Sequence, residues 1–268
     1  MSNTPTPEFL DRAVIVAREA ADAAAQIVRR YYRKDVAVEI KSDQTPVTIA
    51  DRECEVAIKN ILKRAFPDHA FYGEEEGREG SGDFLWLIDP IDGTKSFVRG
   101  YPMFSTQIAL MYRDELVLGV SCASEFGETA WARRGGGAFL EEASRGKAAL
   151  RVAGTNEFGP ATAISIGNVK TLSRDNGWQA LAGLIQRCGR TRGYGDFYHY
   201  HLLARGSLDL VIESDVNILD IAALAVIVQE AGGVFTDLAG RALTLDTTSV
   251  LAGTPALHAQ AIRLGLGE

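Results

Sequence analysis

The chain has 268 residues, of which 46% are hydrophobic and 24% are charged, and its formal net charge is −7. This is an ordinary globular composition, long enough for one large core or two fused lobes, and it excludes intrinsic disorder. The acidic balance argues against a nucleic-acid polymer as partner, because contacts along a phosphate backbone need a basic surface. A small anion could still bind if a metal or a few local donors offset the charge.

The cysteines and the N-terminal segment bear on the compartment. Cys54, Cys122 and Cys188 are scattered, with no Cys-x-x-Cys pair, which predicts buried free thiols in a reducing environment. Residues 1–12 show no basic region followed by an apolar stretch, so no signal peptide is expected. No apolar run approaches the roughly 20 residues of a membrane span. We therefore expect a cytoplasmic protein with no membrane partner.

The first part of the chain predicts two long helices. Thr6 caps the first helix and Pro7 takes its first helical position. The buried face of that helix follows helical spacing at Leu10, Ala13, Val14, Ala17, Ala21, Ala24, Ile27, Val28 and Tyr31. A second helix is predicted over residues 50–65, ending at Phe66-Pro67, with an apolar face of the same spacing.

The pattern then changes to strands alternating with helices. Residues 84–88 form a continuous apolar run, as in a strand that is buried on both faces. Further strands are predicted over 106–112, 116–122, 128–133, 163–166 and 208–213, and helices over 176–188, 197–205 and 218–231. The polar stretch 141–150 suggests a boundary between an N-terminal lobe, 1–146, and a C-terminal lobe, 147–268. The alternation predicts a layered α/β architecture.

The most informative segment is DPIDGT at 89–94, which directly follows the apolar run. The turn lets the carboxylates of Asp89 and Asp92 converge on one point. Their repulsion would raise the pKa of each group, and a hard divalent cation such as Mg²⁺ relieves it. If a helix begins at Gly93, the backbone N–H groups of Gly93 and Thr94 face an anion. Metal carboxylates beside an anion cradle are what phosphoryl-transfer chemistry requires.

A solvated acidic turn is the alternative interpretation of this segment, because Asp, Pro and Gly are common turn residues. Further acidic positions favour a site: Glu74 in Gly-Glu-Glu, Asp51 near a helix start, and Asp220 at the start of an apolar helix. Asp220 alone could equally offset the dipole of its helix. The joint pattern is what predicts metal binding.

Together these motifs resemble the inositol monophosphatase superfamily over nearly the whole chain. Glu74 matches the family's first metal carboxylate, and residues 89–94 match its first signature. Residues 219–223 (Leu-Asp-Ile-Ala-Ala) and 230–233 (Glu-Ala-Gly-Gly) match its second signature. One departure is Leu219, which stands where the family usually has Trp, and this bears on packing beside the metal.

The resemblance implies a fold of the α/β (α+β) class, a layered α-β-α-β-α sandwich with the site between two lobes. The first lobe would carry most metal ligands, and the second would carry the substrate-recognition residues and Asp220. A homodimer is also implied. Lys41 and Asp51 fit the family's upstream Lys and Thr-x-x-Asp elements, and Glu213 fits a position that holds substrate.

The resemblance further implies two or three Mg²⁺ ions in each active site. Glu74, Asp89 and the backbone carbonyl of Ile91 would hold the first ion. Asp89, Asp92 and Asp220 would share the second, and a third, weaker ion would lie near Glu74. These ions would activate a water and stabilise the leaving alkoxide, with no covalent phospho-enzyme.

In the same family scheme, Glu74 and Thr94 orient the attacking water, and Asp51 bonds to Thr94 or to a water. Residues at the first signature hold the phosphate through their backbone N–H groups. The complete set expected to bind substrate is Lys41, Asp92, Gly93, Thr94, Asp196, Glu213 and Asp220.

The substrate, a small phosphorylated metabolite, is suggested by the residues after the first signature. Lys-Ser-Phe-Val-Arg-Gly at 95–100 resembles the histidinol-phosphate phosphatase branch, and so does 195–198. Inositol phosphatases more often carry Thr or Asn at the position of Lys95. Histidinol phosphate bears an amine and an imidazole, and Asp196 and Glu213 could supply carboxylates for them. Asp196 could also cap the helix that follows it.

Other functions stay open. The first alternative is an inositol or broad sugar-phosphate monophosphatase, and the next is a bisphosphate nucleotidase, which would need further basic residues. A binding protein without turnover is the last, although it would not need a water-orienting pair. His199 and His201 lie two apart on a predicted helix, so they are not expected to share a metal. Residues 147–151 are expected to be a solvated linker.

Overall fold

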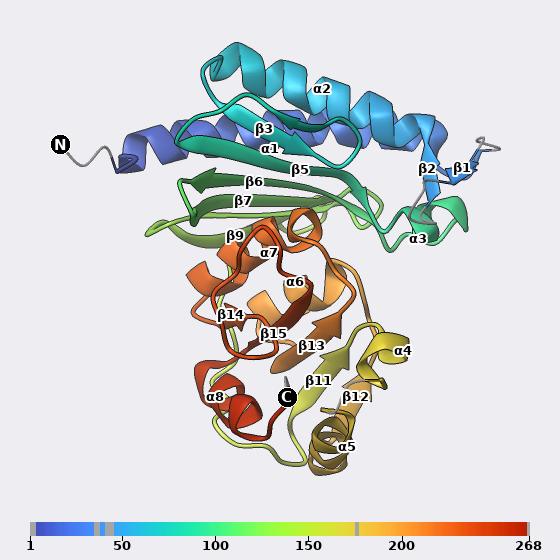
Figure 1. Ribbon diagram of the computed structural model, residues 1–268, viewed down its shortest axis with the longest axis vertical. Helices are drawn as coiled ribbons and strands as arrows, with labels where there is room; N and C mark the ends of the chain where they lie inside the picture. Colours follow the sequence, from blue (N-terminus) through green and yellow to red (C-terminus); the bar gives the residue numbers. More distant parts are fainter. Residues whose placement is uncertain (1–3, 35–37, 41–45, 175–176, 267–268) are drawn as a thin grey trace.

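The computed structural model describes residues 4–34, 38–40, 46–174 and 177–266. Lys41, which was expected to bind substrate, lies outside these described residues. Within them the chain forms a layered α-β-α-β-α sandwich, as the family resemblance predicts, with one sheet of eight strands, one of five and a short two-stranded ribbon. The layers follow one another from top to bottom in Figure 1.

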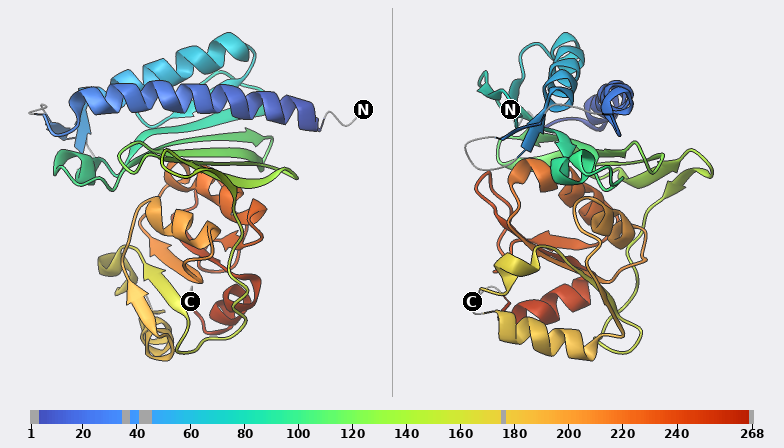
Figure 2. Two further views of the ribbon diagram at one scale, coloured as in Figure 1. Left: turned by 180° about the vertical axis from the view of Figure 1, so that it is seen from behind. Right: turned by 90° about the vertical axis from the view of Figure 1, so that its right-hand side faces the viewer.

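The first layer consists of α1 (Pro7–Tyr31) and α2 (Ile49–Ala65), which run side by side over the outer face of the larger sheet (Figure 2). As predicted, α1 begins at Pro7, and the side chain of Thr6 accepts a hydrogen bond from the N–H of Phe9 at 3.3 Å. Small alanine side chains fill the buried face of α1, so the helix approaches its neighbours closely. The ribbon β1 (Val38–Ile40) and β2 (Pro46–Thr48) precedes α2.

The larger sheet has the strand order β10-β9-β8-β7-β6-β5-β3-β4. Its strands are β3 (Ala70–Gly73), β4 (Gly77–Glu79), β5 (Phe84–Asp92), β6 (Ser105–Tyr112), β7 (Glu115–Ala123), β8 (Glu128–Arg133), β9 (Gly137–Glu142) and β10 (Gly146–Ala149). β3 runs parallel to β5, and the other neighbours pair antiparallel. The parallel pairing brings the carboxyl ends of β3 and β5 to the same edge of the sheet.

The smaller sheet has the order β12-β11-β13-β15-β14. Its strands are β11 (Ala163–Ile166), β12 (Arg190–Arg192), β13 (Leu210–Ser214), β14 (Val234–Thr236) and β15 (Ser249–Gly253). β11 is parallel to both β12 and β13. The outer face of this sheet packs against α5 (Trp178–Arg187) and α8 (Pro255–Arg263), while α4 (Val169–Leu172) follows β11.

Between the sheets lie α6 (Tyr198–Ala204) and α7 (Ile218–Glu230). Residues of α7 are apolar on every side, as expected for a helix that is covered all round. The helix contacts β5, β6, β7 and β8 of the larger sheet and β14 of the smaller one. The first turn of α7 is therefore held at the junction of the two sheets.

Most predicted elements are present within a few residues of their expected bounds, and the differences are local. Residues 147–149, expected in a linker, instead pair with β9 as part of the edge strand β10, so that prediction was wrong. The lobe division at residue 146 stays a prediction. Cys54 and Cys122 are buried, Cys188 is half-buried, and these thiols are free, as expected. In the described part of the chain, no helix combines the length and apolar character needed to cross a bilayer.

We predict that Gly119→Ala destabilises the fold. A Cβ at Gly119, in β7, would lie 2.2 Å from the carbonyl oxygen of Ala223 in α7, so the sheet and the helix would have to separate. Overpacking of this kind costs about 1–3 kcal/mol in the free energy of unfolding, measurable by urea denaturation. Gly183→Ala is the matched control, because a Cβ at Gly183 meets no atom within 4 Å and alanine favours a helix. Equal stability of Gly119→Ala and the wild type would contradict this packing.

Candidate active site

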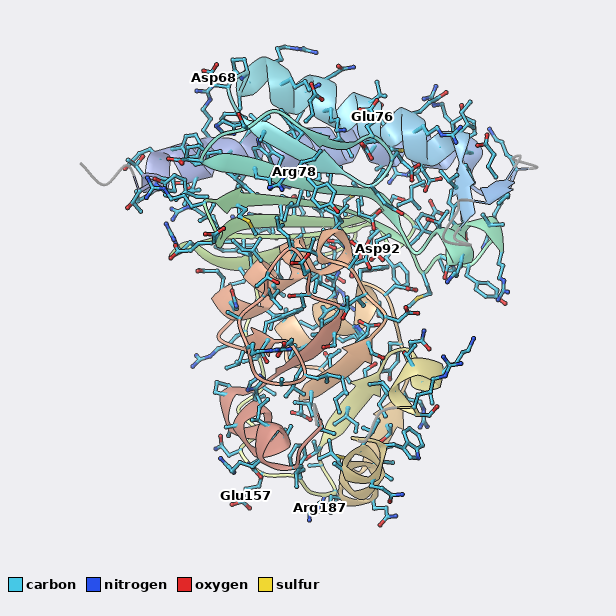
Figure 3. All side chains as sticks on the ribbon, in the orientation of Figure 1. Asp68, Glu76, Arg78, Asp92, Glu157 and Arg187 are labelled. Atoms are coloured by element: carbon cyan, nitrogen blue, oxygen red, sulfur yellow. The ribbon has the colours of Figure 1, made fainter. Side chains whose placement is uncertain are left out.

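Three aspartates from distant parts of the chain meet at the junction of the two sheets. Asp89, Asp92 and Asp220 each offer a carboxylate oxygen, and these oxygens lie within 4.8 Å of one another. Asp89 and Asp92 are at the end of β5, where the register with β6 shifts between them. Asp89 accepts a hydrogen bond from the N–H of Ile91 at 3.0 Å, which closes the turn. Figure 3 labels Asp92 at this junction, beneath the end of the larger sheet.

The first turn of α7 fixes Asp220 through a capping box. The Asp220 carboxylate accepts hydrogen bonds from the backbone N–H of Asn217 at 2.9 Å and from its side-chain amide at 2.7 Å. In return, the Asn217 side chain accepts from the N–H of Leu219 at 2.7 Å. Asp220 therefore belongs to the cap of α7, and its carboxylate also lies within 4.8 Å of the carboxylates of Asp89 and Asp92.

Glu74 joins this cluster through the parallel pairing of β3 and β5. Gly73 lies opposite Ile88 in the ladder, and the N–H of Glu74 donates to the carbonyl oxygen of Ile88 at 3.2 Å. Glu74 therefore lies beside Asp89 in the sheet. It lines a cavity of about 340 Å³, and the other residues around that cavity include Asp89, Ile91, Asp92, Gly93, Thr94 and Asp220. The structure thus brings together all five residues expected to hold metal.

The acidic cluster resists ionisation. Burial raises the pKa of Asp89 and of Asp92 well above the usual range, and repulsion between neighbouring carboxylates adds to this effect. Burial, with repulsion from Glu74, raises the pKa of Asp220 to about 7. Several carboxylates buried at one point are the donor set that a hard divalent cation stabilises, so these residues fit Mg²⁺.

Thr94 and Asp51 meet beside the cluster. Asp51 lies in the first turn of α2, where one carboxylate oxygen accepts hydrogen bonds from the backbone N–H of Thr48 at 2.8 Å and from its hydroxyl at 2.7 Å. Its other oxygen lies 3.4 Å from the hydroxyl of Thr94, which can donate there or to the carbonyl oxygen of Ile91 at 3.0 Å. Burial raises the pKa of Asp51, against the effect of its bonds from Thr48.

Gly93 makes the turn between β5 and α3 (Thr94–Val98) possible. It has a φ of +90°, and a Cβ there would lie 2.6 Å from the carbonyl oxygen of Met103. The carbonyl of Gly93 accepts the N–H groups of Ser96 and Phe97, so a helical turn begins at the end of the metal segment, as expected. The earliest N–H groups of a helix lack partners within it, which suits them to an anion.

A second cavity, of about 310 Å³, adjoins the first and shares Asp92, Lys95, Asp196, Asp215, Val216 and Asp220 with it. The carboxyl ends of the parallel strands β11, β12 and β13 open into this space. Ligands of α/β sheets commonly bind outside such strand ends. The combined space therefore has an acidic part beside the clustered aspartates and a further part beside the smaller sheet.

Glu213 lines this second cavity, and two side chains of α6 hold its carboxylate in place. Its Oε2 accepts a hydrogen bond from the hydroxyl of Tyr200 at 2.6 Å and lies 2.9 Å from Nε2 of His199. Gly167 leaves room for it, since a Cβ there would lie 2.4 Å from Cγ of Glu213. Asp196 also lines the cavity, and burial with repulsion from Glu213 raises the pKa of Asp196 to about 6.

The capping role considered for Asp196 was wrong. In the described residues, the cap position of α6 is Phe197, and no side chain bonds to the N–H groups of that helix start. Asp196 instead adopts a φ of +44° and faces both cavities. The two histidines of α6 point to different partners, as predicted: His199 towards Glu213, and His201 towards Glu128 at 2.8 Å.

Sequence reasoning missed several residues that line the cavities. Lys95 was used as a marker of a family branch, yet it borders both spaces. Asp215 has a φ of +65° and accepts a hydrogen bond from the amide of Asn168 at 2.7 Å, which links α4 to the loop before α7. The available signal was weak: a polar run, Glu-Ser-Asp-Val-Asn, at the end of a predicted strand.

Comparison with known proteins agrees with this geometry. The model of the inositol monophosphatase family matches residues 10–264. A histidinol-phosphatase of Streptomyces coelicolor is 39% identical over 88% of this chain and 90% of its own length. A fructose-1,6-bisphosphatase/inositol-1-monophosphatase of Aquifex aeolicus is 30% identical over 94% of each chain.

A solved structure of similar fold is the extragenic suppressor protein suhB from Bartonella henselae. It has a TM-score of 0.84 and 26% identity, and the match covers 96% of this chain and 99% of that one. The region that matches the family model includes Glu74, Asp89, Asp92 and Asp220. On the family match and the shared fold, the chain belongs to the inositol monophosphatase family.

Proposed function

We propose that this family phosphatase is Mg²⁺-dependent and hydrolyses L-histidinol phosphate to L-histidinol and phosphate, a step of histidine biosynthesis. The observation that carries the proposal is the cluster of buried Asp89 and Asp92 with half-buried Asp220, which opens into a second acidic cavity. The cluster accounts for the chemistry, and the second cavity accounts for the choice of substrate.

Two or three Mg²⁺ ions fit the donor set. Glu74, Asp89 and the carbonyl of Ile91 would hold one ion, and Asp89, Asp92 and Asp220 would hold another, with a weaker ion near Glu74. When bound, the ions supply positive charge that lowers the pKa of a water and stabilises the leaving alkoxide.

The chain's own residues position the reactants. When the Thr94 hydroxyl donates to Asp51, its lone pairs stay free to accept a hydrogen bond from a water. Glu74 lines the same cavity and accepts a hydrogen bond from the second O–H group of that water. The backbone N–H groups of Gly93 and Thr94 bind phosphate oxygens, so the water and phosphorus lie in line. No side chain needs to become phosphorylated.

The second cavity matches a cationic alcohol. Asp196, Glu213 and Asp215 present carboxylates there, and histidinol carries an ammonium and an imidazole that can be cationic. Among the described residues that line the two cavities, Lys95 is the single Lys or Arg side chain. A nucleotide bisphosphate would need more positive charge for its second phosphate. The similarity to a relative named histidinol-phosphatase supports the same choice.

An inositol or sugar phosphate is the alternative substrate, because the Aquifex aeolicus relative is named fructose-1,6-bisphosphatase/inositol-1-monophosphatase. Neutral hydroxyls would donate hydrogen bonds to the same carboxylates. The homodimer and the cytoplasmic location expected from the sequence stay predictions.

One prediction from the proposed function concerns turnover. Phosphate release should be highest with histidinol phosphate, by about tenfold in kcat/KM over inositol phosphate, fructose bisphosphate and a 3′,5′-bisphosphate nucleotide, and EDTA should abolish it.

Glu213→Gln should raise KM for histidinol phosphate more than for inositol phosphate, because it removes a charge that faces the cation. Asp92→Asn is the inactive control.

A preference for inositol phosphate would overturn the proposed substrate. No release from any of these esters by folded wild-type protein with Mg²⁺ would overturn the phosphatase assignment and favour a binding protein without turnover.

A further prediction concerns pH and stability. Because the pKa of Asp220 is raised from 3.8 to about 7, the metal-free folded protein keeps a proton that the unfolded chain loses. This contribution to the free energy of unfolding is complete below the unfolded pKa and is lost as pH rises through about 7. Mg²⁺ prefers the ionised cluster, so it should raise Tm more at about pH 8 than at about pH 6.

Thermal unfolding in EDTA and in Mg²⁺ at both pH values measures this effect. Asp220→Asn should flatten the pH dependence in EDTA, because the variant lacks the titrating carboxyl. A larger stabilisation by Mg²⁺ at the lower pH would contradict the prediction.

A further inference from the structure

A buried ion pair in α2 is not used by the mechanism described above. The side chains of Glu55 and Lys59 are 0% and 2% exposed, and Nζ of Lys59 lies 2.7 Å from Oε1 of Glu55. Neither is among the described residues that line the two cavities. Burying an ion pair costs desolvation free energy that its own attraction often fails to recover, so other contacts of the pair are informative.

The contacts of Glu55 lead to the loop that carries Glu74. The Glu55 carboxylate accepts hydrogen bonds from the backbone N–H groups of Glu75 at 2.7 Å and Glu76 at 3.0 Å. Lys59 donates to the side chain of Glu76 at 2.9 Å. The pair therefore binds the residues directly after Glu74 through both backbone and side chain.

The residue before Glu74 is fitted to the same carboxylate. A Cβ at Gly73 would lie 2.0 Å from Oε1 of Glu55, so only glycine lets the strand end rest on it. On its other side, the N–H of Glu74 bonds to the carbonyl of Ile88 in β5. The main chain on both sides of Glu74 is therefore fixed, by α2 and by β5.

This anchoring opposes a repulsive force. Glu74 lines one cavity with Asp89, Asp92 and Asp220, so these carboxylates repel one another whenever they are ionised and no cation is bound. A loop without an anchor would relax away from the other carboxylates. Glu55 also lies one helical turn after Asp51, so one face of α2 holds both the Thr94 hydroxyl and the Glu74 loop.

We infer that Glu55, paired with Lys59, is a positioning residue that holds the Glu74 loop against the acidic cluster and thereby sets the affinity of the site for divalent cations. The inference rests on the proposed metal site. It does not depend on which phosphate ester is the substrate.

Mn²⁺ titration of the purified protein by calorimetry, with no substrate present, tests the inference. Glu55→Gln keeps the shape of the side chain but turns one acceptor into a donor that faces the loop amides. Mn²⁺ affinity should fall about tenfold or more, as for other outer residues that orient metal ligands. In assays, the Mg²⁺ concentration for half-maximal activity should rise while kcat at saturating Mg²⁺ recovers.

Glu230→Gln is the matched control. The Glu230 carboxylate also accepts two backbone N–H groups, from Gly135 and Gly137 at 2.8 Å each, but at the end of α7 opposite to Asp220. It should lower Tm and leave the Mn²⁺ affinity unchanged. Glu55→Asp guards against misfolding of the glutamine variant, because it keeps the charge opposite Lys59 but withdraws the carboxylate by about 1.5 Å.

Each outcome decides the inference. Weaker Mn²⁺ binding by a folded Glu55 variant, with unchanged binding by Glu230→Gln, supports it. Wild-type Mn²⁺ affinity in folded Glu55→Gln or, if that variant does not fold, in Glu55→Asp overturns it. Wild-type protein that releases phosphate from no ester, while Glu55→Gln still weakens Mn²⁺ binding, would refute the proposed function and leave the positioning role intact.

Discussion

Like charges that are buried together repel one another, and the architecture of this protein is arranged to hold them in place. Asp89, Asp92 and Asp220 lie within reach of one ion in an interior that resists their ionisation. Water could not screen these charges as it screens surface carboxylates. The protein therefore supplies the positioning from its backbone, and in the proposed function a bound cation would supply the compensating charge.

The backbone supplies this positioning through strand pairing and helix capping. Parallel pairing of β3 and β5 places Glu74, directly after β3, beside Asp89 near the end of β5. Capping boxes at the starts of α2 and α7 fix Asp51 and Asp220 through the N–H groups of Thr48 and Asn217. The same hydrogen bonds that cap the start of each helix thus orient a carboxylate toward the site. The larger sheet, α7 and the strand ends of the smaller sheet then enclose the acidic cluster and the adjoining cavity.

Sequence reasoning recovers what depends on periodicity and on dense motifs. The apolar run before DPIDGT predicts β5, helical spacing predicts α1 and α2, and a long apolar segment that starts near Asp220 predicts α7. Strands of three or four residues with polar sequences, such as β4, β10 and β12, have too little pattern to be recognised. α8 carried the same Thr-Pro start signal as α1, at Thr254-Pro255, but was missed. Glu55 and Lys59 look like a solvated i, i+4 pair, because their burial depends on the loop after β3, which is distant in sequence.

Anomalous diffraction from crystals soaked in Mn²⁺ tests the central claim most directly. The account predicts anomalous peaks about 2.2 Å from carboxylate oxygens of Asp89, Asp92 and Asp220, with Glu74 contributing to at least one of the ions. Ordered crystals in which these carboxylates face apart, with no anomalous density among them at saturating Mn²⁺, would contradict it.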